Sequence, residues 1–249
     1  MQGHRLSIFA EMSMLAAETG AINLGQGFPD TDGPTEVLDA AVAAIRAGHN
    51  QYPPDRGIPE LRRAVAGHQD RFYGQEVDPD DVMVSTGASE AIGAAIMALV
   101  SEGQEVVVFE PYFDLYAAVI ALAGGVRRAV TLRAPDYSFD EAQLAATIGP
   151  ETRLILLNTP HNPTGKVFSP EELGVIARLA VQHDLLVVTD EVYEHMTYDG
   201  TQHVPIATLP GMAERTVTIS SGGKSFGLTG WKVGWAHGPT DLVGAVHTV

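Results

Sequence analysis

Cysteine is absent from the 249 residues of this chain. Without thiols, the protein forms no disulfide, binds no metal through thiolate ligands and has no cysteine nucleophile. Long apolar runs are missing as well, because the N-terminal segment mixes His4, Arg5, Glu11 and Glu18 among its apolar residues. The sequence therefore predicts neither a signal peptide nor a transmembrane helix, and the expected location is cytoplasmic.

Basic residues are few: 15 Lys and Arg stand against 31 Asp and Glu, which gives a formal net charge of −16. A surface with this balance repels the phosphates of nucleic acid and of anionic lipid. We therefore expect no nucleic acid and no membrane as a partner. The length is sufficient for one large domain, alone or with an appendage, around a substantial core.

Short apolar runs alternate with longer helical patterns, which is typical of an α/β domain with a mainly parallel sheet. We expect strands at residues 82–85, 105–109, 126–132, 154–158, 185–189 and 217–220, and an edge or antiparallel strand at 233–236. We expect helices at residues 89–100, about 113–123 and 170–183. The last helix is announced by a capping box, with Ser169 as N-cap, Pro170 in the first turn and Glu172 three residues after the cap.

The most specific feature is the glycine-rich run Ser220–Gly227, which places Lys224 just after an apolar segment. The glycines leave the lysine amine uncrowded. Upstream, Asp190 and Tyr193 follow the end of another apolar run. An amine, a carboxylate and a phenol at strand ends are the groups needed to hold a pyridine cofactor through an imine. The sequence therefore predicts chemistry on amino groups.

Other candidate ligand groups also follow strands, at the edge of an open α/β sheet where ligands bind. Gly87-Ala88-Ser89 opens a helix whose backbone amides and Ser89 hydroxyl suit a phosphate. Phe113 offers a face to a flat ring, and Asn162 lies in a loop stiffened by two prolines. Each has an ordinary alternative as a helix cap, a core aromatic or a turn residue. The alternative for Asp190 is a cap, although an acid after so apolar a run needs a cation.

Three other kinds of site fail on spacing. Gly223-Lys224-Ser225 is not a nucleotide-binding P-loop, because Thr218 stands where that loop needs a glycine. Gly25-Gln26-Gly27 is not a dinucleotide fingerprint, because Asp30 takes the place of its third glycine. His195 has no second histidine at helical ligand spacing, so we predict no metal site.

Together these motifs resemble the class I/II, fold-type I aminotransferases that depend on pyridoxal 5′-phosphate. The chain is most similar to the branch holding kynurenine and methionine aminotransferases and cysteine-conjugate β-lyases, and it is also similar to N-succinyldiaminopimelate aminotransferases. The motifs that carry the resemblance, in family order, are Ile22–Asp30, Asn50–Tyr52, Gly57, Gly87–Glu90, Glu110–Phe113, Asn162–Gly165, Asp190–Tyr193 and Lys224–Trp235. The resemblance implies a three-layer α/β sandwich with a mainly parallel mixed sheet, the large domain of that fold.

The resemblance also implies a role for each site residue. Lys224 is the catalytic residue, which joins the cofactor through an imine and moves the proton of the substrate α-carbon. Asp190 keeps the pyridine nitrogen protonated, and Phe113 stacks on the ring. The other implied contacts are Tyr193 and Asn162 at the phenolic oxygen, Ala88, Ser89, Ser221 and Lys232 at the phosphate, Tyr52 at the phosphate of the neighbouring subunit, and Gly25 and Asn162 at the substrate. The expected assembly is a homodimer with shared active sites.

By the same resemblance, residues 1–35 belong to the small substrate domain and residues 36–249 form the large cofactor-binding domain. The family's substrate-carboxylate arginine lies in a C-terminal small domain beyond Val249, so we expect the front portion of a longer enzyme. The implied activity is ping-pong transfer of an amino group from an L-amino acid to a 2-oxo acid. A β-eliminating lyase acting on cysteine conjugates and a non-catalytic regulatory sensor are the alternatives.

Overall fold

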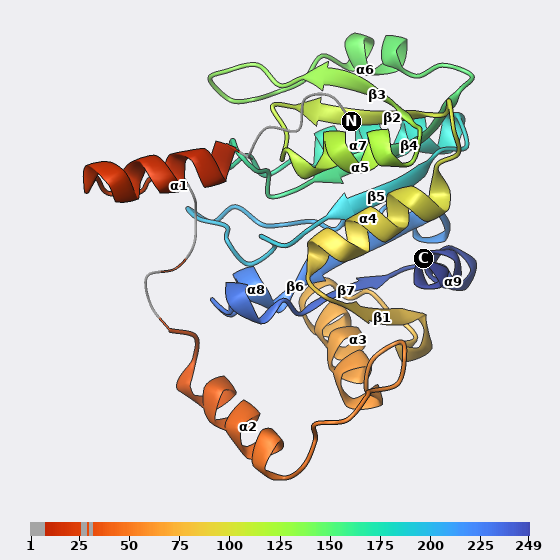
Figure 1. Ribbon diagram of the computed structural model, residues 1–249. Coiled ribbons are helices and arrows are strands. Elements are labelled where there is room, and N and C mark those ends of the chain that lie inside the picture. Colours follow the sequence, from red (N-terminus) through yellow and green to blue (C-terminus); the bar gives the residue numbers. More distant parts are fainter. Residues whose placement is uncertain (1–7, 26–28, 30–31) are drawn as a thin grey trace.

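The computed structural model describes residues 8–25, 29 and 32–249 (Figure 1). Part of the N-terminal family motif, at Gln26–Phe28 and Asp30, lies outside the described residues. The strands are β1 (Val82–Ser85), β2 (Glu105–Glu110), β3 (Val126–Thr131), β4 (Thr152–Asn158), β5 (Leu186–Asp190), β6 (Thr216–Ser221) and β7 (Gly234–His237). The helices are α1 (Ile8–Thr19), α2 (Thr35–Arg46), α3 (Pro59–Tyr73), α4 (Ala88–Leu99), α5 (Leu115–Leu122), α6 (Glu141–Thr147), α7 (Pro170–Gln182), α8 (Gly222–Ser225) and α9 (Thr240–Thr248).

The strands of the described chain form one mixed sheet in the order β1-β7-β6-β5-β4-β2-β3. The five strands from β6 to β3 in this order run parallel, whereas β7 is antiparallel to both of its neighbours. The predicted mainly parallel sheet is therefore confirmed. The expected strand near residue 233 is antiparallel as predicted, but β7 lies inside the sheet and β1 forms the edge.

The core lies in two layers because the central strands are buried on both faces. On β4, Leu154 and Leu156 pack with α4, α5 and α9, whereas Ile155 and Leu157 pack with α6 and α7. This alternation follows from the two-residue period of a strand. Helices therefore cover both faces of the sheet, and the predicted three-layer sandwich is confirmed (Figure 1).

The helix starts expected from the sequence agree with the structure to within two residues for α7 and α5. In α7, the Ser169 hydroxyl accepts a hydrogen bond from the Glu172 amide at 3.2 Å, and the Glu172 carboxylate accepts one from the Ser169 amide at 2.9 Å. The capping box read from the sequence is thus present. The helix expected from Phe113 begins two residues later, at Leu115.

The N-terminal helices α1 and α2 extend away from the sheet (Figure 1). No residue of α2 is buried, and Ile22 and Leu24 between the two helices are 87% and 90% exposed. Neither side chain belongs to a hydrophobic cluster of the described residues. The domain boundary predicted at residue 35 stays a prediction.

Candidate active site

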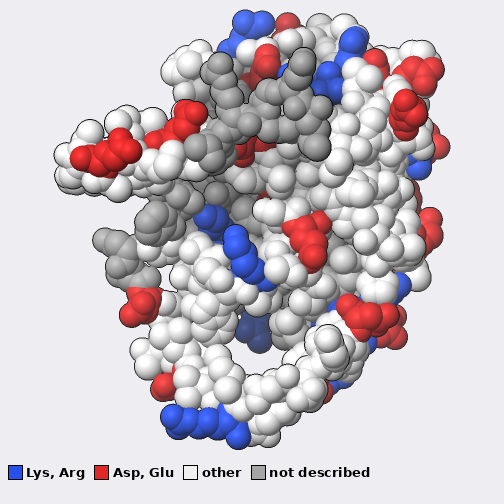
Figure 2. Space-filling view, in the orientation of Figure 1, with Lys and Arg blue, Asp and Glu red and all other residues white. Residues whose placement is uncertain are grey.

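A cleft of about 1070 Å³ opens at the carboxyl ends of the parallel strands. Its lining contains every predicted site residue except one: Gly25, Ala88, Ser89, Phe113, Asn162, Asp190, Tyr193, Ser221, Lys224 and Lys232. The exception is Tyr52, whose side chain is fully exposed and lies outside the cleft. Figure 2 shows Lys or Arg atoms in the recess between α1 and α2, on a molecule whose net charge is −16.

Two adjacent strand ends position Asn162 and Asp190 in the cleft. Asn158 at the end of β4 pairs with Asp190 at the end of β5. The Asn158 amide donates to the backbone carbonyl of Asp190 at 2.8 Å, and its side-chain oxygen accepts from the Asn162 backbone N–H at 2.6 Å. Asn158 therefore joins the loop that carries Asn162 to the strand that carries Asp190. Its sequence position indicated only a strand residue.

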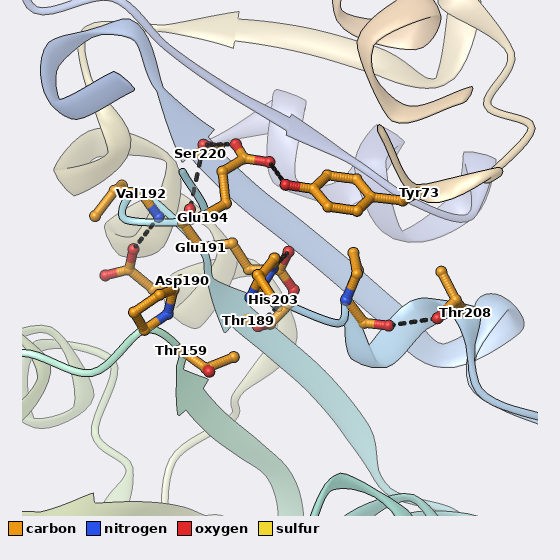
Figure 3. Close-up of polar contacts among 12 residues, drawn as sticks. Tyr73, Thr159, Thr189, Asp190, Glu191, Val192, Glu194, His203, Thr208 and Ser220 are labelled. Carbon is orange, nitrogen blue, oxygen red and sulfur yellow. Dashed lines mark hydrogen bonds and ion pairs between the residues drawn. The ribbon is translucent and has the colours of Figure 1, made fainter. Parts of the chain in front are cut away.

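Asp190 is buried in the floor of the cleft. The Tyr116 hydroxyl donates to its Oδ2 at 2.7 Å. The Val192 backbone N–H donates to its Oδ1 at 3.3 Å (Figure 3). Burial raises the pKa of Asp190 to about 6; the two hydrogen bonds oppose the rise, and the charge of Glu191 adds to it. A cation placed at this carboxylate would therefore be bound strongly, because it relieves the cost of burial.

Tyr116, which the sequence did not single out, contacts Asp190 from behind the cleft lining. It lies on α5 with its side chain 2% exposed, and its ring stands edge-on to that of Phe113 at 5.8 Å between centroids. Burial, the charge of Asp190 and the hydrogen bond to Asp190 raise the pKa of Tyr116. The hydroxyl therefore stays protonated and donates. A lone tyrosine in an alanine-rich helix gives no local signal of this contact, which joins residues 74 positions apart.

Lys224 lies in the single helical turn α8, which the glycine-rich run did not predict. Its Nζ is 5.7 Å from the centroid of the Tyr193 ring. Burial and then the charge of Lys232 lower the pKa of Lys224, while Asp190 opposes this. A lowered pKa makes more of the neutral, nucleophilic amine available near neutral pH.

Tyr193 and Asn162 meet at the wall of the cleft. Burial and then the charge of Asp190 raise the pKa of the Tyr193 phenol, and a hydrogen bond from the Asn162 side chain opposes this. A neutral phenol beside an amide offers donors to an oxygen of a bound ring. The two residues therefore lie side by side, and their roles toward a cofactor stay a prediction.

The opposite end of the cleft suits an anion. Helix α4 begins there, and its N-cap Gly87 has φ +80° and no side chain to cap the first amides. A Cβ added to Gly234 of β7 would lie 2.4 Å from the Gly87 carbonyl carbon, so only glycine lets the strand pass this turn. Lys232 has a left-handed backbone, φ +56°, a conformation uncommon for residues other than glycine and found at functional sites.

The described part of the chain has no helix long and apolar enough to cross a membrane. The cytoplasmic location read from the sequence stays a prediction.

Comparison with known proteins agrees with this geometry. Residues 19–249 match the family described as Aminotransferase class I and II. A Mycobacterium tuberculosis protein named "Probable N-succinyldiaminopimelate aminotransferase DapC" is 50% identical over 250 residues, which cover 99% of this chain and 63% of the relative. The Dictyostelium discoideum kynurenine–oxoglutarate transaminase is 44% identical over 96% of this chain and 60% of its own.

The solved structure of N-succinyldiaminopimelate aminotransferase from Mycobacterium tuberculosis has a TM-score of 0.96 to this chain at 50% identity. The match covers 98% of this chain and 65% of that structure, so the chain spans less than two thirds of these relatives. The resemblance read from the motifs and the fold implied by it are both confirmed. The chain belongs to the class I and II aminotransferase family.

Proposed function

We propose that the protein to which this chain belongs binds pyridoxal 5′-phosphate and transfers an amino group from an L-amino acid to a 2-oxo acid. The observation that carries the proposal is the pairing, within one cleft, of Lys224 with the buried carboxylate of Asp190. An amine of lowered pKa and a carboxylate that needs a cation match the aldehyde and the pyridinium of that cofactor.

The donors of the cleft fit the cofactor along its whole length. The α4 amides at Ala88 and Ser89, the Ser221 hydroxyl and the Lys232 charge would hold the phosphate. Lys232 would contribute a positive charge at the phosphate, but a lysine cannot form the bidentate hydrogen bonds that an arginine would form there. Phe113 would stack on the ring, while Tyr193 and Asn162 would bond its phenolic oxygen.

When bound, pyridoxal phosphate supplies an electron sink for the negative charge that develops at the substrate α-carbon. Asp190 would keep the ring nitrogen protonated, since an opposite charge in contact favours the charged form. Tyr116 orients the carboxylate by its hydrogen bond. The Lys224 amine would move the proton between the substrate α-carbon and the cofactor, which is general acid–base catalysis by a positioned side chain.

The exposed Tyr52 fits a role in a second copy of the chain. Its side chain is 100% exposed and reaches no part of its own cleft. We infer a homodimer in which Tyr52 contacts the phosphate of the neighbouring cofactor and Gly25 lines the substrate pocket. The N-terminal residues 1–35 and a C-terminal segment would together form the small domain that closes this pocket.

The first test concerns Lys224, one of three lysines in the chain. Borohydride reduction of the cofactor-loaded full-length protein should fix the cofactor covalently to Lys224, identified by mass spectrometry of peptides. Lys224→Ala should lose this adduct and the transfer of amino groups. Lys166→Ala is the matched control and should keep both, because its Nζ pairs with Glu172 at 2.8 Å outside the cleft.

An adduct on Lys166 or Lys232 would overturn the assignment. The reaction type is tested separately by incubation with one amino acid and no acceptor. Accumulation of pyridoxamine phosphate supports transfer, whereas release of pyruvate and ammonia would show β-elimination instead.

A further inference from the structure

A second polar cluster lies where α3 packs beside the segment that follows β5. His68 comes from α3, and Glu194 and His195 directly follow Tyr193 in the chain. The Nε2 atoms of His68 and His195 are 2.7 Å apart, and the Glu194 Oε2 is 3.9 Å from the His68 Nε2. One ligand atom from each residue lies within 4.8 Å of the other two. The sequence has no second histidine at helical spacing from His195, but the fold brings His68 next to it.

Glu194 is a buried carboxylate whose partners do not neutralise it. Its side chain is 1% exposed, its Oε2 accepts from the Tyr73 hydroxyl at 2.7 Å, and its Oε1 accepts from the Ser220 hydroxyl at 2.6 Å (Figure 3). Both donors are neutral. Among the described residues, the His68 ring is a basic group within ion-pair range of Glu194, at 3.9 Å. A buried charge of this kind is costly unless a cation or a metal compensates it.

The hydrogen-bond partner of the His68 Nδ1 is compatible with a neutral ring whose unprotonated Nε2 faces Glu194 and His195. The Gln69 side chain is buried, with its Nε2 at 3.3 Å from the His68 Nδ1 and its Oε1 without a partner. The two ends of an amide are assigned from such networks. With the amide turned, the Gln69 Oε1 accepts a proton from Nδ1–H, which leaves the His68 Nε2 unprotonated. Histidines that bind metals are held in this way by a second hydrogen bond.

We propose that His68, Glu194 and His195 bind one divalent transition metal ion of the zinc type. Two imidazoles and a carboxylate form a known ligand set for Zn²⁺, and the exposed side of His195 leaves a position for water. Metal–nitrogen bonds of about 2.0–2.1 Å in a tetrahedron separate two nitrogens by roughly 3.3 Å. His195, which is exposed, moves outward by a fraction of an ångström to admit the ion.

The ion would join α3 to the segment that carries the cleft residues. Glu194 and His195 lie one and two residues after Tyr193, but neither lines the cleft. Tyr73 and Ser220 orient the Glu194 carboxylate from α3 and β6, as second-layer partners of metal ligands do. The metal therefore acts as a structural clamp behind the cleft and takes no part in the chemistry within it.

The experiment uses untagged full-length protein treated with EDTA and titrated calorimetrically with ZnCl₂. We expect one equivalent of Zn²⁺ per chain and a rise in the thermal unfolding midpoint on binding. His195→Ala and His68→Ala should each weaken binding tenfold or more and abolish the rise. His183→Ala, which removes an exposed histidine at the end of α7, is the matched control and should bind as the parent protein does.

Because His195 is exposed, its variant should fold even if His68→Ala does not. Loading with Co²⁺ gives an independent signature. The visible absorption of Co²⁺ bound to the parent protein should differ from that of Co²⁺ added to His195→Ala. Absence of saturable Zn²⁺ binding, or equal affinity in His195→Ala and the parent, would overturn the proposal. The two rings would then only share a hydrogen-bonded proton.

Discussion

At the scale of single residues, Asp190 has an electrostatically unfavourable position in the cleft. Its carboxylate is buried, and its direct partners are a tyrosine hydroxyl and a backbone amide. Its pKa, raised to about 6, means that the folded protein resists ionising it. A residue kept at such a cost is characteristic of a functional site.

The raised pKa of Asp190 predicts that the stability of the cofactor-free protein depends on pH. Because the folded pKa of about 6 lies above the ordinary 3.8, the folded state binds more protons between these values, and stability falls as pH rises through this window. Asp190→Asn keeps an oxygen for Tyr116 but does not titrate. Urea unfolding should therefore show that the free energy of unfolding of Asp190→Asn rises relative to that of the parent between about pH 4 and pH 6. Above pH 6 the difference should have changed by roughly 1–3 kcal/mol in favour of the variant.

Asp199→Asn is the matched control. Asp199 is exposed, so its substitution should leave the difference between pH 4 and pH 7 unchanged. Parallel stability profiles for Asp190→Asn and the parent would mean that the carboxylate is already solvated or paired.

At the scale of elements, local signals decide where several helices begin. At the start of α7, the side chains of Ser169 and Glu172 each accept a hydrogen bond from the other's backbone amide. The Glu172 carboxylate also forms an ion pair with Lys166 at 2.8 Å. Helix α7 buries Leu173 and Ile176 against the sheet. The capping box thus fixes a helix that forms much of one core layer.

Removal of this cap should cost a measurable part of the free energy of unfolding. Ser169→Ala leaves the Glu172 amide without its side-chain acceptor, so we expect a loss of about 1 kcal/mol, within a range of about 0.5–2 kcal/mol. Ser169→Thr keeps the hydroxyl and should lose less. Equilibrium urea unfolding of the two variants measures the difference, and equal losses would show that the hydroxyl contributes nothing there.

At the scale of the whole molecule, the N-terminal segment forms one side of the cleft. Leu24 and Gly25 line it, while Ile22, Leu24 and Tyr52 are strongly exposed. An exposed apolar side chain at a ligand site, such as Leu24, is typical of a surface that another chain or segment covers. The proposed homodimer and small domain would supply such a cover.

Mixed full-length dimers test whether Tyr52 serves the neighbouring site. When Tyr52→Phe chains pair with Lys224→Ala chains, both lesions fall in one site and the other stays intact. We expect such heterodimers to have up to about half of the parent activity, well above the Lys224→Ala homodimer. When one chain carries both substitutions and pairs with a parent chain, each site receives one lesion, so activity should be lower. Equal activity in the two arrangements would show that Tyr52 contributes to neither site, and higher activity in the second arrangement would place it in its own site.

The sequence by itself determined the features that depend on neighbours along the chain. The apolar run Leu154–Leu157 required a strand buried on both faces, and the Ser169 capping box placed the start of α7. The order of strands and helices then put Asp190, Asn162 and Lys224 at the carboxyl edge of a parallel sheet. The candidate site was predictable because parallel strands bring their ends together.

Only the tertiary structure decided the contacts between distant segments. Gly234 places β7 inside the sheet, because its missing side chain lets the strand pass Gly87. Tyr116 reaches Asp190 across 74 residues, and His68 reaches His195 across 127. Such pairings depend on which surfaces pack together, which leaves no periodicity or spacing in the local sequence. Packing of α5 and α3 onto the sheet is the physical cause of both.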